Sequence, residues 1–238
     1  MSSYRWAFAA LFLASAACAA PIDDAWERAS APYRKALLAT NTGDASGARA
    51  ATAQFREEWE RFREAYGSRP PKPYGRDRAW SSEVARIGEW AAEAERKVAA
   101  GDLPGAHETL ERVRERWMAL RTRNGVRWFA DGMTRFHTDM EALIPALGDG
   151  PEELSGPVLW PRVAATVRRM ERTLADLPRS QGPVLPDSEA RERAAMLALL
   201  RQRLAAVRVA VAQRDATASR AAVREMKPAF VKLFLRFG

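Results

Sequence analysis

The chain has almost no cysteine or histidine: it holds one Cys and two His among 238 residues. A single Cys cannot form a disulfide within the chain, so the fold has to be held together by burial of apolar side chains. Apolar residues make up 47% of the sequence, which is ordinary for a packed protein and excludes wholesale disorder. The length suits one large domain or two small ones.

The chain also lacks the common catalytic and nucleotide-binding motifs. It contains no G-x-G-x-x-G, G-x-x-x-x-G-K-S/T, H-E-x-x-H or G-x-S-x-G sequence, the usual signatures of dinucleotide, phosphate, zinc-protease and hydrolase sites. Carboxylates are frequent, but each has an Arg within helical reach, as in Glu57 with Arg61 and Glu108 with Arg112. We therefore expect surface ion pairs rather than an acid–base couple, and a protein that is not an enzyme.

The basic residues do not form a block that interleaves with aromatic side chains. The net charge is +8, but Arg alternates with Glu along the predicted helices, as in the E-R-V-R-E-R sequence of residues 111–116. This pattern is typical of solvated helix surfaces with charges of both signs. We therefore expect no nucleic-acid partner.

Long apolar runs are missing except at the start of the chain. Residues 1–20 carry one basic residue, then an apolar run and then small residues, which is the pattern of a secretory signal peptide. The run is too short and wrongly flanked for a stable transmembrane helix. We therefore expect a protein that is exported to the periplasm.

The single cysteine, Cys18, follows a Ser-Ala-Ala sequence at the place where a bacterial lipoprotein would be acylated, although Ser stands where Leu is usual. Two alternatives remain open. Cleavage after Ala19 or Ala20 would give a free periplasmic protein, the alternative that we favour. Acylation of Cys18 would attach the protein to the envelope, and this lipid anchor would be its only contact with a membrane.

A repeat runs through the rest of the chain. In three segments, which begin at residues 43, 101 and 214, a Gly-Asp or Arg-Asp dipeptide is followed by glycine 24 residues after its start. The spacing predicts a fourth, decayed copy near residue 158 that lacks the dipeptide. Bulky apolar residues recur at offsets of 12, 16 and 19 from each start: Phe55, Trp59 and Phe62; Val113, Trp117 and Leu120; Met170, Leu174 and Leu177; Met226, Phe230 and Leu233.

Each repeat predicts a helical hairpin. A first helix leads into the tight turn at the dipeptide, a second helix of about 20 residues follows, and a left-handed glycine ends it. These glycines are Gly67, Gly125, Gly182 and Gly238. The predicted helices are 24–40, 46–66, 78–99, 104–123, 126–147, 161–177, 188–213 and 216–236. Nothing alternates as a strand would, so the predicted fold class is all-α.

The apolar residues of these helices recur at three and four residues, as in antiparallel bundles. Four hairpins of about 57 residues form either two four-helix bundles in tandem or one eight-helix array. We divide the chain into the signal peptide 1–20, a first hairpin pair 21–125 and a second hairpin pair 126–238. The connection at 124–125 is so short that the two halves must stay in contact.

The segment from Trp80 to Gly125 carries a further resemblance. Its centre, EWAAEAERKVAAGDLPGAHETLERVRERWMALRTRNG, has two antiparallel helix patterns, a Gly-containing turn followed by Ala, and an Arg-rich final helix. It resembles the closing hairpin of the soluble periplasmic b-type cytochromes and, more loosely, the cytochrome c-prime bundles. The resemblance implies a four-helix bundle without haem. One Cys cannot supply Cys-x-x-Cys-His, and the helix end at 121–125 lacks the axial His of the b-type family.

One segment combines ligands that suit a soft metal ion. Met133 lies four residues before His137 and Met140 lies three after it, so two thioethers and an imidazole share one helix face, with Glu141 one turn further on. Sulfur with imidazole favours copper, especially Cu(I). The same residues also fit ordinary packing, because both Met lie on the apolar face of the helix, where Met often fills gaps in a core.

The second histidine, His107, is a weaker candidate ligand. If the helices on either side of 124–125 fold back on each other, His137 lies opposite Arg114 and His107 lies opposite Ile144. The two imidazoles would then be offset by about 10 Å along the axis, too far apart to bind one ion.

These observations predict an exported, non-enzymatic binding protein. Its ligand would be copper or a related metal held by Met133, His137, Met140 and Glu141. The alternative is an interaction or scaffold protein of the envelope, lipid-anchored if Cys18 is acylated, that holds a partner helix in a groove between hairpins.

Overall fold

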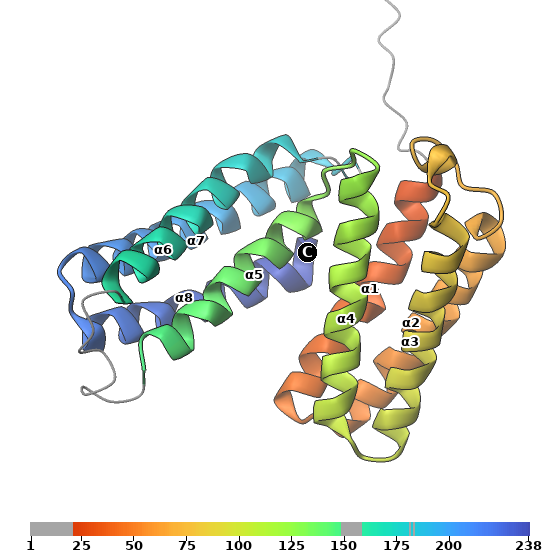
Figure 1. Ribbon diagram of the computed structural model, residues 1–238, viewed down its shortest axis with the longest axis horizontal. Helices are drawn as coiled ribbons and strands as arrows, with labels where there is room; N and C mark the ends of the chain where they lie inside the picture. The colour runs from red at the N-terminus through yellow and green to blue at the C-terminus, as the bar shows by residue number, and fades with distance from the viewer. Residues whose placement is uncertain (1–20, 149–158, 181, 183) are drawn as a thin grey trace, which may run out of the picture.

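The computed structural model describes residues 21–148, 159–180, 182 and 184–238, and within them every helix or strand element is a helix (Figure 1). The α-helices are α1 (Pro21–Thr42), α2 (Ala45–Tyr66), α3 (Trp80–Ala99), α4 (Leu103–Arg123), α5 (Phe129–Ala146), α6 (Leu159–Asp176), α7 (Asp187–Ala212) and α8 (Ala216–Phe237). The all-α fold class is confirmed, and each helix begins and ends within three residues of its predicted bounds. The predicted signal peptide, with Cys18, lies outside the described residues.

The repeated dipeptides form the tight turns between α1 and α2, α3 and α4, and α7 and α8. Gly43 and Gly101 adopt left-handed φ angles of 77° and 81°, and Arg214 takes the same region with φ 55°. The aspartate that follows caps the next helix, because its carboxylate accepts the backbone N–H three residues on at 2.9 Å. These caps are Asp44, Asp102 and Asp215.

The glycines that end the repeats agree with the prediction only in part. Gly125 is left-handed with φ 74°, as predicted. The prediction is wrong for Gly67, whose φ is −60°, because its N–H still bonds Arg63 O at 2.8 Å and the helical turn continues through it. Gly182 has φ 152° but lies beyond the 3₁₀ turn Leu177–Arg179, so it does not end α6.

The eight helices form two four-helix bundles. In the first bundle α1, α2, α3 and α4 each contact the next helix, and α4 returns to α1; α5, α6, α7 and α8 close a second ring in the same way. Figure 1 shows the first bundle on the right and the second on the left, with α4 and α5 diverging from the connection that joins them. The bundles meet where α4 leads into α5 and where α8 contacts α1.

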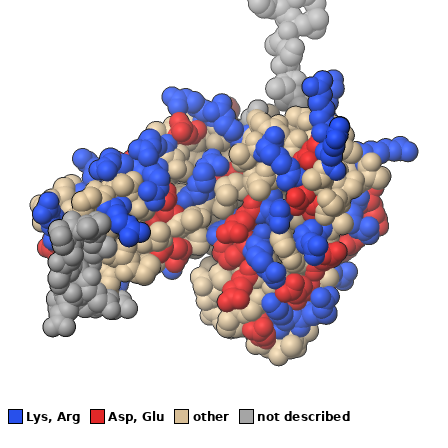
Figure 2. All heavy atoms as spheres, in the orientation of Figure 1, with Lys and Arg blue, Asp and Glu red and all other residues tan. Residues whose placement is uncertain are grey.

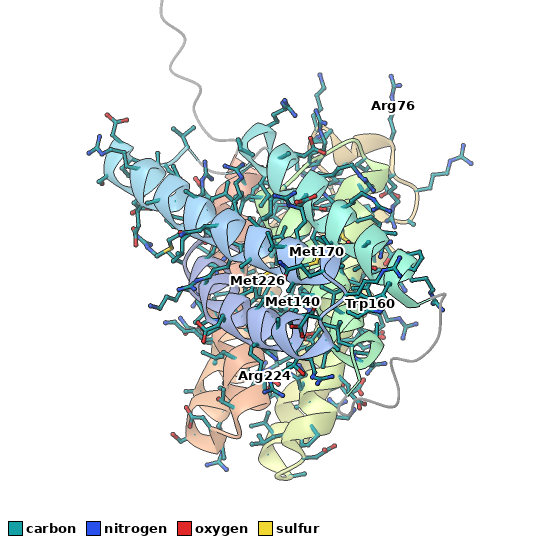
Figure 3. All side chains as sticks on the ribbon, turned by 90° about the vertical axis from the view of Figure 1, so that its left-hand side faces the viewer. Arg76, Met140, Trp160, Met170, Arg224 and Met226 are labelled. Atoms are coloured by element: carbon teal, nitrogen blue, oxygen red, sulfur yellow. The ribbon has the colours of Figure 1, made fainter. Side chains whose placement is uncertain are left out.

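The two bundles have different cores. The first is aromatic: Trp59 and Phe62 stack with ring centroids 4.7 Å apart, and the ring of Trp117 meets that of Trp26 edge-on at 5.7 Å. The second is rich in methionine, and Met140, Met170 and Met226 lie among its helices (Figure 3). All twelve apolar positions of the repeat are buried, as the repeat predicts, and one apolar cluster extends through both bundles.

Charge is also divided unequally. Residues 21–125 carry 19 basic and 17 acidic side chains, whereas residues 126–148 and 159–238 together carry 18 basic and 10 acidic ones. In Figure 2 the two signs mix over the first bundle, while Lys and Arg predominate along the upper edge of the second. The predicted pair of Glu57 and Arg61 is present at 2.5 Å. The second predicted pair is wrong, because Arg112 binds Glu93 of α3 at 2.9 Å.

Candidate binding site

A cavity of about 400 Å³, partly open to solvent, lies between the two bundles. We call it the junction cavity. Its walls come from α1 and α4 of the first bundle and from α5 and α8 of the second. Much of the lining is apolar, with Leu37 and Leu38 from α1 and Phe230, Val231 and Phe234 from α8. This volume falls within the range of small-molecule sites in proteins.

Six polar side chains cross the junction cavity from α4 to α8, and we call them the polar row: His107, Glu111, Arg114, His137, Glu141 and Lys227. On α4, His107 Nε2 lies 3.6 Å from Glu111 Oε1. The other oxygen of Glu111, Oε2, accepts a hydrogen bond from Arg114 Nη2. The ring of His107 is held from α1, where its Nδ1 lies 3.2 Å from Leu37 O and 3.1 Å from Thr40 Oγ1.

The polar row continues from one bundle into the other through Arg114. Its Nη2 donates to His137 Nδ1 on α5 at 3.0 Å. This contact confirms the predicted position of His137 opposite Arg114. Beyond it, Glu141 Oε1 lies 3.6 Å from both His137 Nε2 and Lys227 Nζ of α8.

The imidazole of His137 is held neutral. Burial, followed by the nearby charges of Arg114 and Lys227, lowers the pKa of His137 to about 3. Because Nδ1 accepts from Arg114, the hydrogen-bonding pattern assigns the ring proton to Nε2, which faces Glu141. Burial also lowers the pKa of His107 and raises that of Glu111. The cavity therefore disfavours isolated charges of either sign.

The structure places four of the five predicted metal ligands at this cavity. His107, His137, Met140 and Glu141 line it, and the remaining candidate, Met133, does not. Met133 is fully buried in the second bundle, as the packing interpretation predicts, and Met140 is buried at the base of the cavity. Figure 3 shows Met140 between the helices together with Met170 and Met226. Among the described residues, no three His, Cys, Asp or Glu side chains are grouped so that they could hold a metal ion.

A buried ion pair beside the cavity fastens α4 to α5. Arg121 binds Asp131 through two nitrogens, with Nε 3.0 Å from Oδ2 and Nη2 2.5 Å from Oδ1, and the two side chains are only 3% and 1% exposed. The guanidinium also lies over the rings of Trp26 and Trp128, at 4.9 and 5.7 Å from their centroids. The ion pair therefore holds the start of α5 against the end of α4.

Sequence reasoning missed Arg114, Arg121 and Asp131 as site and junction residues. It assigned the arginines of α4 to a solvated surface, yet Arg114 and Arg121 are buried. One signal was available: each directly follows an apolar position of the repeat, Val113 and Leu120, and so borders the buried face of α4.

Comparison with known proteins gives this chain no family. No protein-family model, no curated protein and no solved structure matches it. Within the described part of the chain, no helix is long and apolar enough to cross a membrane. The resemblance to the b-type cytochromes stays a prediction, and what is established of the chain is two four-helix bundles with a ligand-sized cavity between them.

Proposed function

We propose that the protein is a non-enzymatic binding protein, exported to the periplasm, whose ligand occupies the junction cavity. The observation that carries the proposal is the cavity itself: its volume suits a small molecule, and apolar side chains face the polar row, whose central Arg114 is buried. The ligand that fits this lining has an apolar body and a head group that forms hydrogen bonds.

The arrangement of the polar row supports binding rather than catalysis. Arg114 donates hydrogen bonds to Glu111 and His137. Glu141 lies between His137 and Lys227. A general base needs a free acceptor directed at a substrate, whereas His137 Nδ1 is already occupied by a guanidinium N–H. Such mutually paired groups are suited to orienting a ligand's head group.

A fluorescent probe with this chemistry tests the proposal. The uncharged dye 1-anilinonaphthalene has an apolar body and one N–H donor, and we expect it to bind the full chain with a saturable rise in fluorescence. Val231→Trp places a large ring in the junction cavity and should weaken binding about tenfold or more, an effect of about 1.4 kcal/mol.

The matched control is Val209→Trp. Val209 lies on α7 and is 50% exposed, away from the cavity, so this variant should bind the probe as the wild type does. Equal binding by the two variants would overturn the assignment of the cavity as the ligand site.

Copper is the second candidate ligand, favoured by the meeting of His107, His137, Met140 and Glu141 at one cavity. The guanidinium of Arg114 against His137 opposes it, because a cation would be repelled there. Elemental analysis after equilibration with copper tests this candidate. Near-stoichiometric copper that is lost in His137→Ala but kept in Met133→Leu would support it, and a metal-free wild type would end it.

A further inference from the structure

We propose that the ligand of the junction cavity carries an uncharged head group in which a hydrogen-bond acceptor lies beside a donor, as in a primary amide or an alcohol. The inference rests on the proposed function, because it concerns the same cavity. Two atoms carry it, His137 Nε2 and Glu141 Oε1, which lie 3.6 Å apart and belong to side chains that both line the cavity. We call these two atoms the head-group pair.

The first atom of the pair is a hydrogen-bond donor. The guanidinium of Arg114 can only donate, so His137 Nδ1 at 3.0 Å has to accept, and the neutral ring then carries its proton on Nε2. Among the described residues this Nε2–H has no acceptor within hydrogen-bonding distance, because Glu141 Oε1 at 3.6 Å is too far away. The imidazole is only 21% exposed, so a ligand atom that accepts this proton would satisfy a largely buried donor.

The second atom of the pair is a hydrogen-bond acceptor. Glu141 Oε1 also lies 3.6 Å from Lys227 Nζ, again beyond hydrogen-bonding distance. A ligand N–H or O–H that reaches this oxygen would gain a charge-assisted hydrogen bond. One amide or hydroxyl group can contact both atoms of the pair, because they are only 3.6 Å apart. The pair therefore favours a head group that accepts from His137 and donates to Glu141.

The charges around the head-group pair oppose a charged head group. A carboxylate would be repelled by Glu141, and Glu111 and Glu115 of α4 also line the cavity. An ammonium group would be repelled by Arg114 and Lys227, and it has no lone pair to accept the imidazole proton. An uncharged head group avoids both kinds of repulsion and costs less to remove from water.

The position of the head-group pair also places the rest of the ligand. The ring of Phe230 on α8 packs against that of His137, with the ring centroids 5.4 Å apart. Val231 and Phe234, on the same helix, line the cavity as well. His137 therefore lies where the polar row meets the apolar wall, and a ligand whose head group contacts it has its apolar body beside α8.

Displacement of 1-anilinonaphthalene from the full chain by compounds with similar alkyl chains tests the inference. Octanamide has an acceptor and donors, N,N-dimethyloctanamide keeps only the acceptor, and octanoate and octylamine are charged in neutral buffer. We expect octanamide to bind about tenfold more tightly than each of the other three, because it alone contacts both atoms of the pair without bringing a charge. Equal affinity of the two amides, or tighter binding of either charged compound, would overturn the proposal.

A pair of matched variants tests the role of Glu141. Glu141→Leu removes the acceptor, so octanamide should lose its advantage over N,N-dimethyloctanamide. The control Glu225→Leu makes the same change on α8 at a carboxylate that is 71% exposed and does not line the cavity, and it should keep the advantage. Each comparison is made between two compounds within one variant, so a general loss of stability does not affect it. An advantage that persists in Glu141→Leu would show that the head-group pair does not select the ligand.

Failure of this inference and failure of the proposed function give different results. If the dye binds, Val231→Trp weakens its binding and all four compounds compete equally, the cavity is a ligand site without the proposed preference. If the dye does not bind, or if Val231→Trp binds it as Val209→Trp does, the proposed function fails and this inference fails with it.

Discussion

At the scale of single residues, the junction depends on arginines that are withdrawn from water. Arg121 and Asp131 are almost fully buried, and the aromatic rings of Trp26 and Trp128 flank the guanidinium. Removing one partner of such a pair leaves an uncompensated buried charge, which costs more than the pair itself contributes. Burial gives these residues an importance that exposed pairs of the same chemistry do not have.

Asp131→Asn should therefore lower the free energy of unfolding by about 3 kcal/mol, because the Arg121 guanidinium keeps its charge and loses its counterion. Chemical denaturation followed by circular dichroism measures the change. Asp139→Asn is the control: its pair with Arg169 is at the surface, where the arginine is 48% exposed, and it should cost less than about 1 kcal/mol. Equal costs for the two variants would contradict the structure.

His137 makes stability depend on pH. Its pKa is lowered to about 3 in the folded protein, against 6.5 for the free side chain, so the unfolded chain takes up the proton first as the pH falls. The stabilisation is fully present above about pH 6.5 and is lost progressively toward pH 3. From pH 7 to pH 5, the wild type should lose about 2 kcal/mol more than His137→Gln, whose amide oxygen can still accept from Arg114.

Denaturant titrations of both proteins at the two pH values measure this difference. Other titrating groups, including Glu111 with its raised pKa, are common to both proteins, so their effects cancel in the comparison to first order. The same pH dependence in wild type and variant would show that His137 is not held neutral.

At the scale of elements, the helical hairpins follow from local chemistry. A left-handed residue ends one helix at Gly43, Gly101 and Arg214, and the aspartate after it caps the next helix. The hairpin of α5 and α6, which holds the decayed copy of the repeat near residue 158, has no such dipeptide. Its two helices are separated by a longer connection. Turn chemistry and apolar spacing act within a few residues, which is why the helix bounds could be predicted closely from the sequence.

Asp102→Ala should destabilise the protein by about 1 kcal/mol, because the Gly105 N–H loses its acceptor at the start of α4. The control Ser188→Ala changes an exposed residue in the first turn of α7 and should stay within about 0.5 kcal/mol of the wild type. Denaturation midpoints at unchanged slope measure both values. A cost at Asp102 no larger than the control's would show that the cap contributes nothing.

At the scale of the whole molecule, the contacts between the two bundles should make them a single folding unit. A continuous apolar cluster passes through both, and the Arg121–Asp131 pair and the polar row cross between them. Separating the bundles would expose this apolar surface and leave buried charges unpaired. Cooperative unfolding is therefore expected.

Two probes report on different parts of this unit. Most Trp residues belong to the first bundle, so their fluorescence follows it, whereas far-ultraviolet circular dichroism follows the helices of both. The two denaturation curves should coincide in the wild type. A second transition seen only by circular dichroism would show that the second bundle unfolds independently and that the junction is weak.

The sequence by itself determined the all-α class, the hairpins with their turns and the position of His137 opposite Arg114, because each follows from spacing and turn chemistry over short distances. The tertiary structure alone decided that the hairpins pair into two bundles, that Met133 is in the core while Met140 reaches the cavity, and that arginines of α4 are buried. The physical reason is that periodicity shows which face of a helix is apolar. It does not show whether residues at the edge of that face are covered by another helix or exposed to solvent. Arg114 and Arg121 look like surface residues until a second bundle, joined by a short connection, is packed against them.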